Sequence, residues 1–195
     1  MHTLIMTVGL PRSGKSTWAR EYAAQHNTPV VNPDSIRLAL HGQAFVASAE
    51  PMVWAVAHLM VSSLFKAGHA TVILDATNIT EHRRKDWRSR EWMCHYVCFT
   101  APRDECIRRA RAQGQEELVP IIERMASSLE WPEPSTFDGQ HDTTFMHWVE
   151  PEGFLTEAKM DETEADRQRA EERRLLTTAP VRSDLGSFMR RVPRR

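Results

Sequence analysis

The sequence predicts an α/β domain with a parallel sheet of four to five strands flanked by helices. Three short apolar runs, at residues 3–8, 70–74 and 95–99, have the length and composition of buried strands. Segments with apolar residues at helical spacing separate these runs, and the connecting loops are short. Strands that alternate with helices favour a parallel sheet, because each crossover helix returns the chain to the same edge.

Two weaker strands and a series of helices complete the predicted order. Residues 29–31 are expected to form a short second strand and residues 145–149 a late one. Asn32 can cap the helix that follows, with Pro33 in its first turn, and Thr80 can cap another. The remaining helices are predicted over residues 15–25, 51–65, 81–93, 102–113, 119–129 and 161–176.

Length and composition restrict the class of protein. The 195 residues suggest one domain with a C-terminal extension. The chain has no apolar run of about 18 residues and no secretory signal, so we expect no membrane partner. Its three cysteines show no CxxC spacing, which favours reduced thiols over a disulfide framework or a zinc site. These features predict a cytoplasmic protein.

The formal net charge of −1 hides an uneven distribution of charge along the chain. Residues 1–113 carry a net charge of +5, residues 114–164 carry −11 and residues 165–195 carry +5. The near-neutral total therefore does not exclude a polyanionic substrate. Arginines dominate the 25 cations, and their planar fork matches phosphate. Because a biased base composition explains that excess equally well, only the placement of the arginines can indicate function.

Residues 9–17 read GLPRSGKST and fit the phosphate-binding pattern GxxxxGK[ST]. Glycines let backbone N–H groups turn toward phosphate oxygens, and the positive end of the following helix favours the anion. In this pattern Lys15 reaches the β- and γ-phosphates and Ser16 ligates magnesium. We therefore expect ATP and Mg²⁺ as cofactors, bound by Gly9, Arg12, Ser13, Gly14, Lys15, Ser16 and Thr17.

This loop occurs in GTPases, motor ATPases and small kinases, and other residues separate these classes. A GTPase would carry an NKxD base-reading motif, which the sequence lacks. The third strand ends at Asp75 without the adjacent glutamate with which a motor ATPase activates water. A kinase instead needs a base near the acceptor hydroxyl and a cationic lid.

Asp34 is the best candidate for that base, because it follows the second strand at the carboxyl edge of the sheet, where ligands bind. Arg37 shares its helix face and could hold an acceptor phosphate. Ordinary alternatives remain open: a first-turn acid for Asp34, a surface ion pair for Arg37 and a solvated basic face for the lid helix. The candidate lid arginines are Arg103, Arg108, Arg109 and Arg111.

Three segments in this order, GLPRSGKSTWARE, VVNPDSIR and VILDATNITEHRRKDW, resemble the kinase domain of phage-type polynucleotide 5'-hydroxyl kinases. The resemblance covers roughly residues 3–130 and implies a P-loop kinase fold with a helical lid. We expect the kinase domain over residues 1–150, with its lid at about 102–118. Residues 151–195 would then form a C-terminal extension with a charged helix and a basic tail.

The resemblance implies transfer of the γ-phosphate of ATP to a hydroxyl on nucleic acid, DNA rather than RNA. Lys15 and Ser16 would hold phosphate and magnesium, Asp34 would be the general base, and Arg37 would contact the acceptor phosphate. The residues implied to line or support the acceptor channel are Thr77, Asn78, Arg83 and Arg84.

Two departures from the family pattern leave parts of this assignment open. In the family a lid arginine directly precedes a glycine, whereas here Gln113 precedes Gly114. The catalytic lid arginine would have moved to Arg109 or Arg111, or been lost. Many relatives also carry a 3'-phosphatase motif, DxDGT, which this sequence lacks.

The acceptor also remains open at this stage. Related phage kinases phosphorylate the hydroxymethyl group of a modified pyrimidine in DNA, of the 5-hydroxymethyluracil type, which requires the base to leave the stack. A small-metabolite or nucleoside kinase would share the loop and the sheet, as would a nucleotide-binding switch without phosphotransfer. Aromatic residues that could stack on an extruded base, or pack in the core or lid, are Trp131, Phe145, His147 and Trp148.

Overall fold

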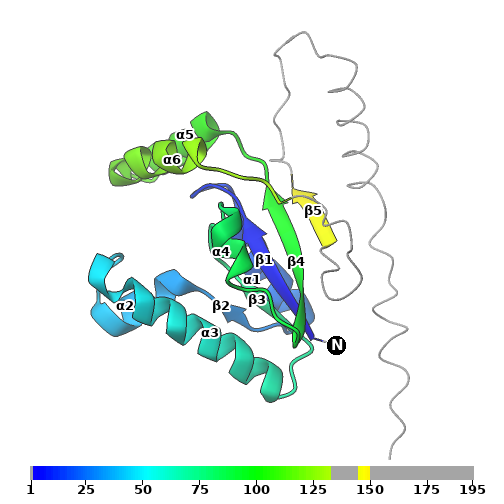
Figure 1. Ribbon diagram of the computed structural model, residues 1–195. Helices are drawn as coiled ribbons and strands as arrows, with labels where there is room; N and C mark the ends of the chain where they lie inside the picture. The colour runs from blue at the N-terminus through cyan, green and yellow to red at the C-terminus, as the bar shows by residue number, and fades with distance from the viewer. Residues whose placement is uncertain (1, 133–144, 150–195) are drawn as a thin grey trace, which may run out of the picture. The chain divides into compact units, whose positions relative to one another are not determined.

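A computed structural model of the chain describes residues 2–132 and 145–149. These residues form a parallel five-stranded sheet with the strand order β2-β3-β1-β4-β5 (Figure 1). The α/β fold class and the predicted number of strands are therefore confirmed. The strands are β1 (His2–Val8), β2 (Val30–Val31), β3 (Thr71–Leu74), β4 (Trp92–Phe99) and β5 (Phe145–Val149).

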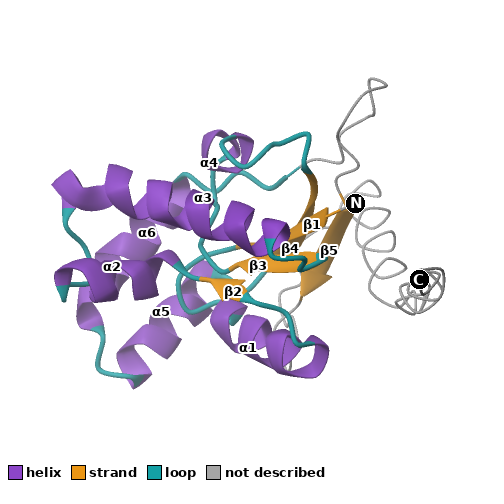
Figure 2. Ribbon diagram, turned by 90° about the horizontal axis from the view of Figure 1, so that it is seen from below, coloured by secondary structure: helices purple, strands orange, loops and turns teal. Residues whose placement is uncertain are grey.

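Helices cover both faces of this sheet, with α1 on one face and α3 on the other (Figure 2). None of the helices among the described residues is long and apolar enough to cross a membrane. The predicted helix over residues 161–176 lies outside the described residues. The α-helices are α1 (Lys15–His26), α2 (Pro33–His41), α3 (Glu50–Lys66), α4 (Glu81–Lys85), α5 (Arg103–Ala112) and α6 (Val119–Ser127), and the 3₁₀ turns are η1 (Ala47–Ala49) and η2 (Glu116–Leu118).

Strand β1 occupies the centre of the sheet and is covered on both faces. Successive side chains of a strand point to opposite faces, so Leu4 and Met6 pack on the side of α3 while Ile5 packs on the side of α1. All three are almost fully buried. Burial on both faces explains why β1 reads as an almost continuous apolar run rather than an alternating one.

Side-chain caps fix the starts of α2 and α4 as the sequence predicts. The Asn32 side-chain oxygen accepts from the Ser35 backbone N–H at 2.8 Å, and the Thr80 hydroxyl accepts from the Arg83 N–H at 3.4 Å. The cap at Asn32 matters for function because it sets the direction in which α2 leaves the carboxyl edge of the sheet.

The helix predicted over residues 81–93 is wrong in its extent, because α4 ends at Lys85 and β4 already begins at Trp92. Trp87 and Trp92 are both buried, and the Trp92 indole N–H donates to the Trp87 carbonyl at 2.9 Å. Trp92 also pairs in register with His2 of β1. These tertiary contacts of two large aromatic residues override the helical periodicity of the segment.

Helices α5 and α6 pack side by side next to the carboxyl end of β4 (Figure 1). A small core of their own, which includes Cys106 and Ala110 of α5 and Ile122 of α6, holds them together. Leu10 from the loop after β1 belongs to the same core. The predicted lid, residues 102–118 with α5, is therefore anchored directly to the loop that it would cover.

Candidate active site

The loop after β1 has a backbone that only glycine suits at two positions. Gly9 has a φ of 149°, and a Cβ there would lie 2.8 Å from the Phe99 carbonyl oxygen. Gly14, with a φ of 107°, is the N-cap of α1 and provides no side-chain cap. The Gly9 N–H donates to the Thr77 carbonyl at 3.0 Å, which ties the loop to the end of β3. The first-turn N–H groups of α1 thus face a loop shaped to receive an anion.

Lys15 is buried inside this loop, with a side chain that already points into it. Its ammonium donates to the Leu10 carbonyl at 2.5 Å and to the Ser13 hydroxyl at 3.3 Å. Burial lowers the pKa of Lys15 to about 8, while the carboxylates of Asp75 and Asp34 act in the opposite direction. A buried amine with so few neutralising partners fits a polyphosphate, whose charge would restore the ammonium form.

The remaining loop residues also suit a nucleotide with its metal ion. Ser16 and Thr17 are exposed in the first turn of α1, where the Ser16 hydroxyl could ligate a cation. No cluster of three or more histidine, cysteine, aspartate or glutamate side chains gathers within the described part of the chain. Magnesium bound with nucleotides typically uses few protein ligands together with phosphate oxygens and water. The residues present therefore fit Mg-ATP without a dedicated metal cage.

Asp75 joins the ends of the three strands that surround this loop. It is 5% exposed, and one carboxylate oxygen accepts from the Asn32 amide at 2.9 Å. Its other oxygen accepts from the Thr7 hydroxyl at 3.4 Å. Thr7 is the residue before the last in β1, Asn32 follows β2 and Asp75 follows β3. This network fixes the Lys15 loop relative to the start of α2.

Asp34 lies in the first turn of α2 and is 79% exposed, whereas the neighbouring Arg37 side chain is only 12% exposed. The Arg37 guanidinium donates to Asp34 at 2.5 Å and, with two further nitrogens, to both carboxylate oxygens of Glu50 at 2.6 and 2.7 Å. These hydrogen bonds, first of all those to Glu50, raise the pKa of Arg37 and lower that of Glu50. Arg37 therefore links the exposed carboxylate of Asp34 to the more buried carboxylate of Glu50.

Two arginines from different elements lie over the ring of Trp54 in α3. The guanidinium carbon of Arg37 lies 5.9 Å from the indole centroid and that of Arg83 lies 5.1 Å from it. The indole N–H donates to Glu50 at 3.2 Å, so the ring is held in place. The predicted acceptor residues Arg37 and Arg83 are thus brought together on one aromatic side chain.

The other predicted acceptor residues are engaged in the structure itself. Asn78, with a φ of 44°, is 3% exposed and donates its amide to the Thr7 carbonyl at 2.9 Å. Arg84 is 4% exposed and donates to the carbonyls of Asn78 and Glu130 at 3.0 and 2.7 Å. Thr77 is half-buried and contributes its carbonyl to the bond with Gly9. Arg84 and the Asn78 amide nitrogen hold the strand ends together, whereas the buried Oδ1 of Asn78 has no hydrogen-bond partner among the described residues.

The two candidate lid arginines are separated by the packing of α5. Arg109 donates to the Arg12 carbonyl in the phosphate loop at 3.3 Å and to Glu105 at 2.6 Å. Arg111 points elsewhere, 3.4 Å from Glu116 and 59% exposed. Hydrogen bonds from Arg108 and then from Arg109 lower the pKa of Glu105 to about 2. Arg109, not Arg111, is therefore the lid arginine that lies at the loop.

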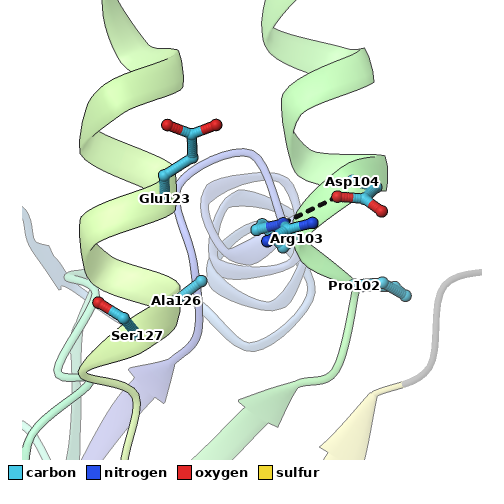
Figure 3. Close-up of a pocket in the computed structure, with 6 residues that line it drawn as sticks. All are labelled: Pro102, Arg103, Asp104, Glu123, Ala126 and Ser127. Carbon is cyan, nitrogen blue, oxygen red and sulfur yellow. Dashed lines mark hydrogen bonds and ion pairs between the residues drawn. The ribbon is translucent and has the colours of Figure 1, made fainter.

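A surface hollow also lies between α5 and α6, away from these residues (Figure 3). Arg103 in it is already paired with Asp104 at 2.8 Å. This leaves the loop after β1 as the better candidate for nucleotide binding. The hollow is lined by Pro102, Arg103, Asp104, Glu123, Ala126 and Ser127.

Two residues that complete the site, Glu50 and Trp54, do not follow from the sequence. Both lie in the first turn or two of an apolar helix, where Trp54 reads as core and Glu50 as an ordinary first-turn acid. A lone acid at the start of an otherwise apolar helix is the available signal. The pairing of Glu50 with Arg37 spans a loop whose path the sequence does not reveal.

A parallel sheet with the phosphate loop after its central strand, a buried loop lysine and a helical lid defines a P-loop kinase fold. The sequence model of the AAA_33 family, described as an AAA domain, matches residues 4–130. The chain belongs to this family.

Solved structures agree with this fold. A chain in the structure titled Pnkp1/Rnl/Hen1 complex is similar at 27% identity with a TM-score of 0.51. The match covers 55% of the present chain and only 38% of that chain. A putative kinase from Chloroflexus aurantiacus matches at 14% identity and a TM-score of 0.54, over 90% of this chain and 98% of its own. A sugar kinase from Janibacter matches at 15% identity and a TM-score of 0.51, over 76% of this chain and 84% of its own.

Proposed function

We propose that this protein is an ATP-dependent kinase that phosphorylates a hydroxyl on nucleic acid, most like a polynucleotide 5'-hydroxyl kinase. One observation carries the proposal. The Asp75 carboxylate ties Thr7, in the strand that leads to the Lys15 loop, to Asn32, which caps the helix that presents the exposed carboxylate of Asp34. A phosphoryl transfer enzyme needs Lys15 and Asp34 together, because one group binds the donor phosphates and the other receives the acceptor proton.

The proposed roles follow from the position of each side chain. When bound, Mg-ATP would supply the γ-phosphoryl group. Lys15 and the Ser16 hydroxyl would hold the phosphates and the metal ion, and Arg109 would stabilise negative charge at the lid side of the loop. As the acceptor oxygen bonds to the γ-phosphorus and the bond to the bridging oxygen breaks, the hydroxyl proton passes to Asp34. Arg37 keeps that carboxylate in place.

The choice of nucleic acid as the acceptor has two supports. Three segments of the sequence resemble polynucleotide 5'-hydroxyl kinases, and the neighbour in the structure titled Pnkp1/Rnl/Hen1 complex has the highest identity among the structures compared above. Residues 1–113, which carry every motif of the site, have a net charge of +5. Cationic surface favours a polyanionic acceptor over a neutral one. The phage-type subfamily and DNA as the preferred strand are parts of the same proposal.

The test is an acceptor screen with ATP labelled in its γ-phosphate. We expect label in 5'-hydroxyl DNA oligonucleotides. Parallel arms contain 5'-hydroxyl RNA, DNA with internal 5-hydroxymethyluracil and blocked 5' ends, and neutral and acidic sugars. Label only in the internal base would shift the acceptor to a modified pyrimidine. Label only in a sugar would overturn the nucleic-acid proposal.

A variant pair tests the chemistry independently of the acceptor. Asp34→Asn should lower kcat by about 10²- to 10⁴-fold, because it removes the proton acceptor, and should leave ATP binding nearly unchanged. Asp104→Asn is the matched control, since Asp104 is similarly exposed at 81% and is also paired with an arginine. Phosphotransfer at the wild-type rate by Asp34→Asn would contradict the proposed mechanism.

A further inference from the structure

Residues Leu10 to Ser13 form a β-turn within the phosphate loop, and Arg12 occupies its third position. The Ser13 N–H donates to the Leu10 carbonyl at 3.2 Å, which closes the turn. Pro11 in the second position has a fixed negative φ while Arg12 has a φ of 66°, so the turn is of type II. The third position of such a turn favours glycine or asparagine, because other side chains are strained there. A strained residue of this kind is typical of a functional site.

The phosphate-binding pattern includes Arg12 in the loop but leaves the residue type at its position open. The side chain is half-buried, and within residues 2–132 and 145–149 its guanidinium makes no hydrogen bond or ion pair. The four arginines of α5 differ, because each is paired with a carboxylate. The pairs are Arg103 with Asp104, Arg108 and Arg109 with Glu105, and Arg111 with Glu116. Arg12 thus keeps its five N–H donors available for a ligand.

This turn lies at the part of the loop where the β- and γ-phosphates are expected. The Lys15 ammonium donates to the Leu10 carbonyl at 2.5 Å and to the Ser13 hydroxyl at 3.3 Å, and these residues are the two ends of the turn. In the phosphate-binding pattern this ammonium reaches the β- and γ-phosphates. Arg109 donates to the Arg12 carbonyl at 3.3 Å and so fixes the turn to α5. Arg12 therefore belongs to the part of the loop that contacts both the buried amine and the lid.

We propose that Arg12 is a catalytic residue whose guanidinium donates to the γ-phosphate of ATP and stabilises the charge that develops on it during transfer. Its planar fork suits two oxygens of one phosphoryl group. Such a contact strengthens as charge spreads over the equatorial oxygens in the transition state. Arg12 keeps its own protons throughout, because a guanidinium is not deprotonated in proteins. Arg109 then has a second task, since it fixes the backbone that carries Arg12.

This inference rests on the proposed function for the donor, ATP, and not for the acceptor. The first experiment therefore needs no acceptor: calorimetry compares the binding of Mg-ATP and Mg-ADP, which differ in the γ-phosphate. In Arg12→Gly we expect the affinity for ATP to fall about 10- to 100-fold, as for the loss of hydrogen bonds to a charged group, and the affinity for ADP to stay within about twofold. Arg12→Lys should keep part of the preference for ATP, because it retains the charge without the fork.

The second experiment measures activity and stability together, because the two should change in opposite directions. With the acceptor that the wild-type protein labels best, Arg12→Gly should lower kcat about 10²- to 10³-fold. Its Tm without nucleotide should instead rise by up to about 4 °C, because glycine adopts a φ of 66° without strain. Arg12→Ala should lose as much activity with no gain in Tm, because alanine keeps the strained backbone.

Asn27→Gly is the matched control for the change of backbone. Asn27 also has a left-handed conformation, with a φ of 49°, and is exposed at the C-cap of α1. The variant should keep the wild-type kcat and the wild-type preference for ATP over ADP.

Either of two results would overturn the inference. One is a preference for ATP over ADP, or a kcat, that Arg12→Gly leaves at the wild-type value, as expected for a solvated surface cation. The other is a loss of activity in Arg12→Gly together with a lower Tm and weaker ADP binding, which indicates a structural role. Failure of the proposed function differs from both, because the wild-type protein would then label no nucleic acid. The comparison of ATP with ADP would in that case still support or contradict the role of Arg12.

Discussion

The side chain of Arg109 on α5 donates a hydrogen bond of 3.3 Å to the backbone carbonyl of Arg12 in the phosphate loop. Arg12 adopts a left-handed backbone, with a φ of 66°, which orients that carbonyl within the loop. Glu105 fixes the other side of the Arg109 guanidinium at 2.6 Å. The lid and the loop are therefore in direct contact through a side chain that retains further N–H donors for phosphate.

This contact predicts which lid arginine acts in catalysis. Arg109→Ala should lower kcat by about 10²- to 10³-fold, because a preorganised donor to the developing charge is lost. Arg111 is an arginine of the same helix, but it points toward Glu116. The kcat of Arg111→Ala should therefore stay within about threefold of the wild-type value. Steady-state kinetics with saturating acceptor measure both. Equal losses in the two variants would contradict the assignment.

The low pKa of Lys15 predicts that nucleotide binding takes up a proton in mildly alkaline solution. Burial places the pKa at about 8, so the amine of the free protein is largely neutral at about pH 9. Phosphate oxygens favour the ammonium form, so Mg-ATP binding at about pH 9 should take up close to one proton. At about pH 6.5 the uptake by Lys15 should be negligible. Calorimetry in buffers of different ionisation enthalpy measures the difference.

The same shift determines how stability changes with pH in the absence of nucleotide. The unfolded chain binds more protons than the folded one between pH 8 and 10.5, so the contribution of Lys15 to the free energy of unfolding rises over this range. Lys15→Met should remove both the proton uptake and this rise. Proton uptake that is the same at both pH values in the wild-type protein would contradict the shift.

Arg84 is expected to stabilise the fold rather than bind the acceptor. Arg84→Ala should lower the free energy of unfolding by about 2–4 kcal/mol, because it leaves the carbonyls of Asn78 and Glu130 without their donor in a buried place. The adjacent exposed Lys85→Ala should change it by no more than about 0.5 kcal/mol. Urea unfolding compares them, and similar values for both variants would refute the structural role.

The sequence predicts the fold well where the residues of a single element are sufficient to identify it. β1 and β3 are covered on both faces, so their apolar runs identify them without further information. The caps at Asn32 and Thr80 depend on residues close in sequence, so they can be predicted equally well. The helix prediction over residues 81–93 fails because the burial of Trp87 and Trp92 depends on α3 and β1, which are distant in sequence.

The candidate site shows the same limit. The position of Asp34 at the carboxyl edge follows from strand alternation alone. The choice between Arg109 and Arg111 does not, because it depends on how α5 is rotated by its packing on α6 through Cys106 and Ala110. The sequence suggests that Arg37 is free to bind phosphate. In the structure its guanidinium instead donates to Glu50, across the α2–α3 connection. Pairings across irregular loops leave no periodic signal in sequence.

The strand order β2-β3-β1 has a consequence for how two substrates can meet. The Lys15 loop follows β1 and the helix with Asp34 follows β2, so one strand, β3, stands between these two points of the sheet edge. With neighbouring strands about 4.8 Å apart, these points are separated by roughly 10 Å. In the proposed reaction the sheet would act as a spacer of fixed width, wide enough for a phosphoryl group to pass between two oxygens. The separation of these two points is therefore set by backbone hydrogen bonding and not by flexible side chains.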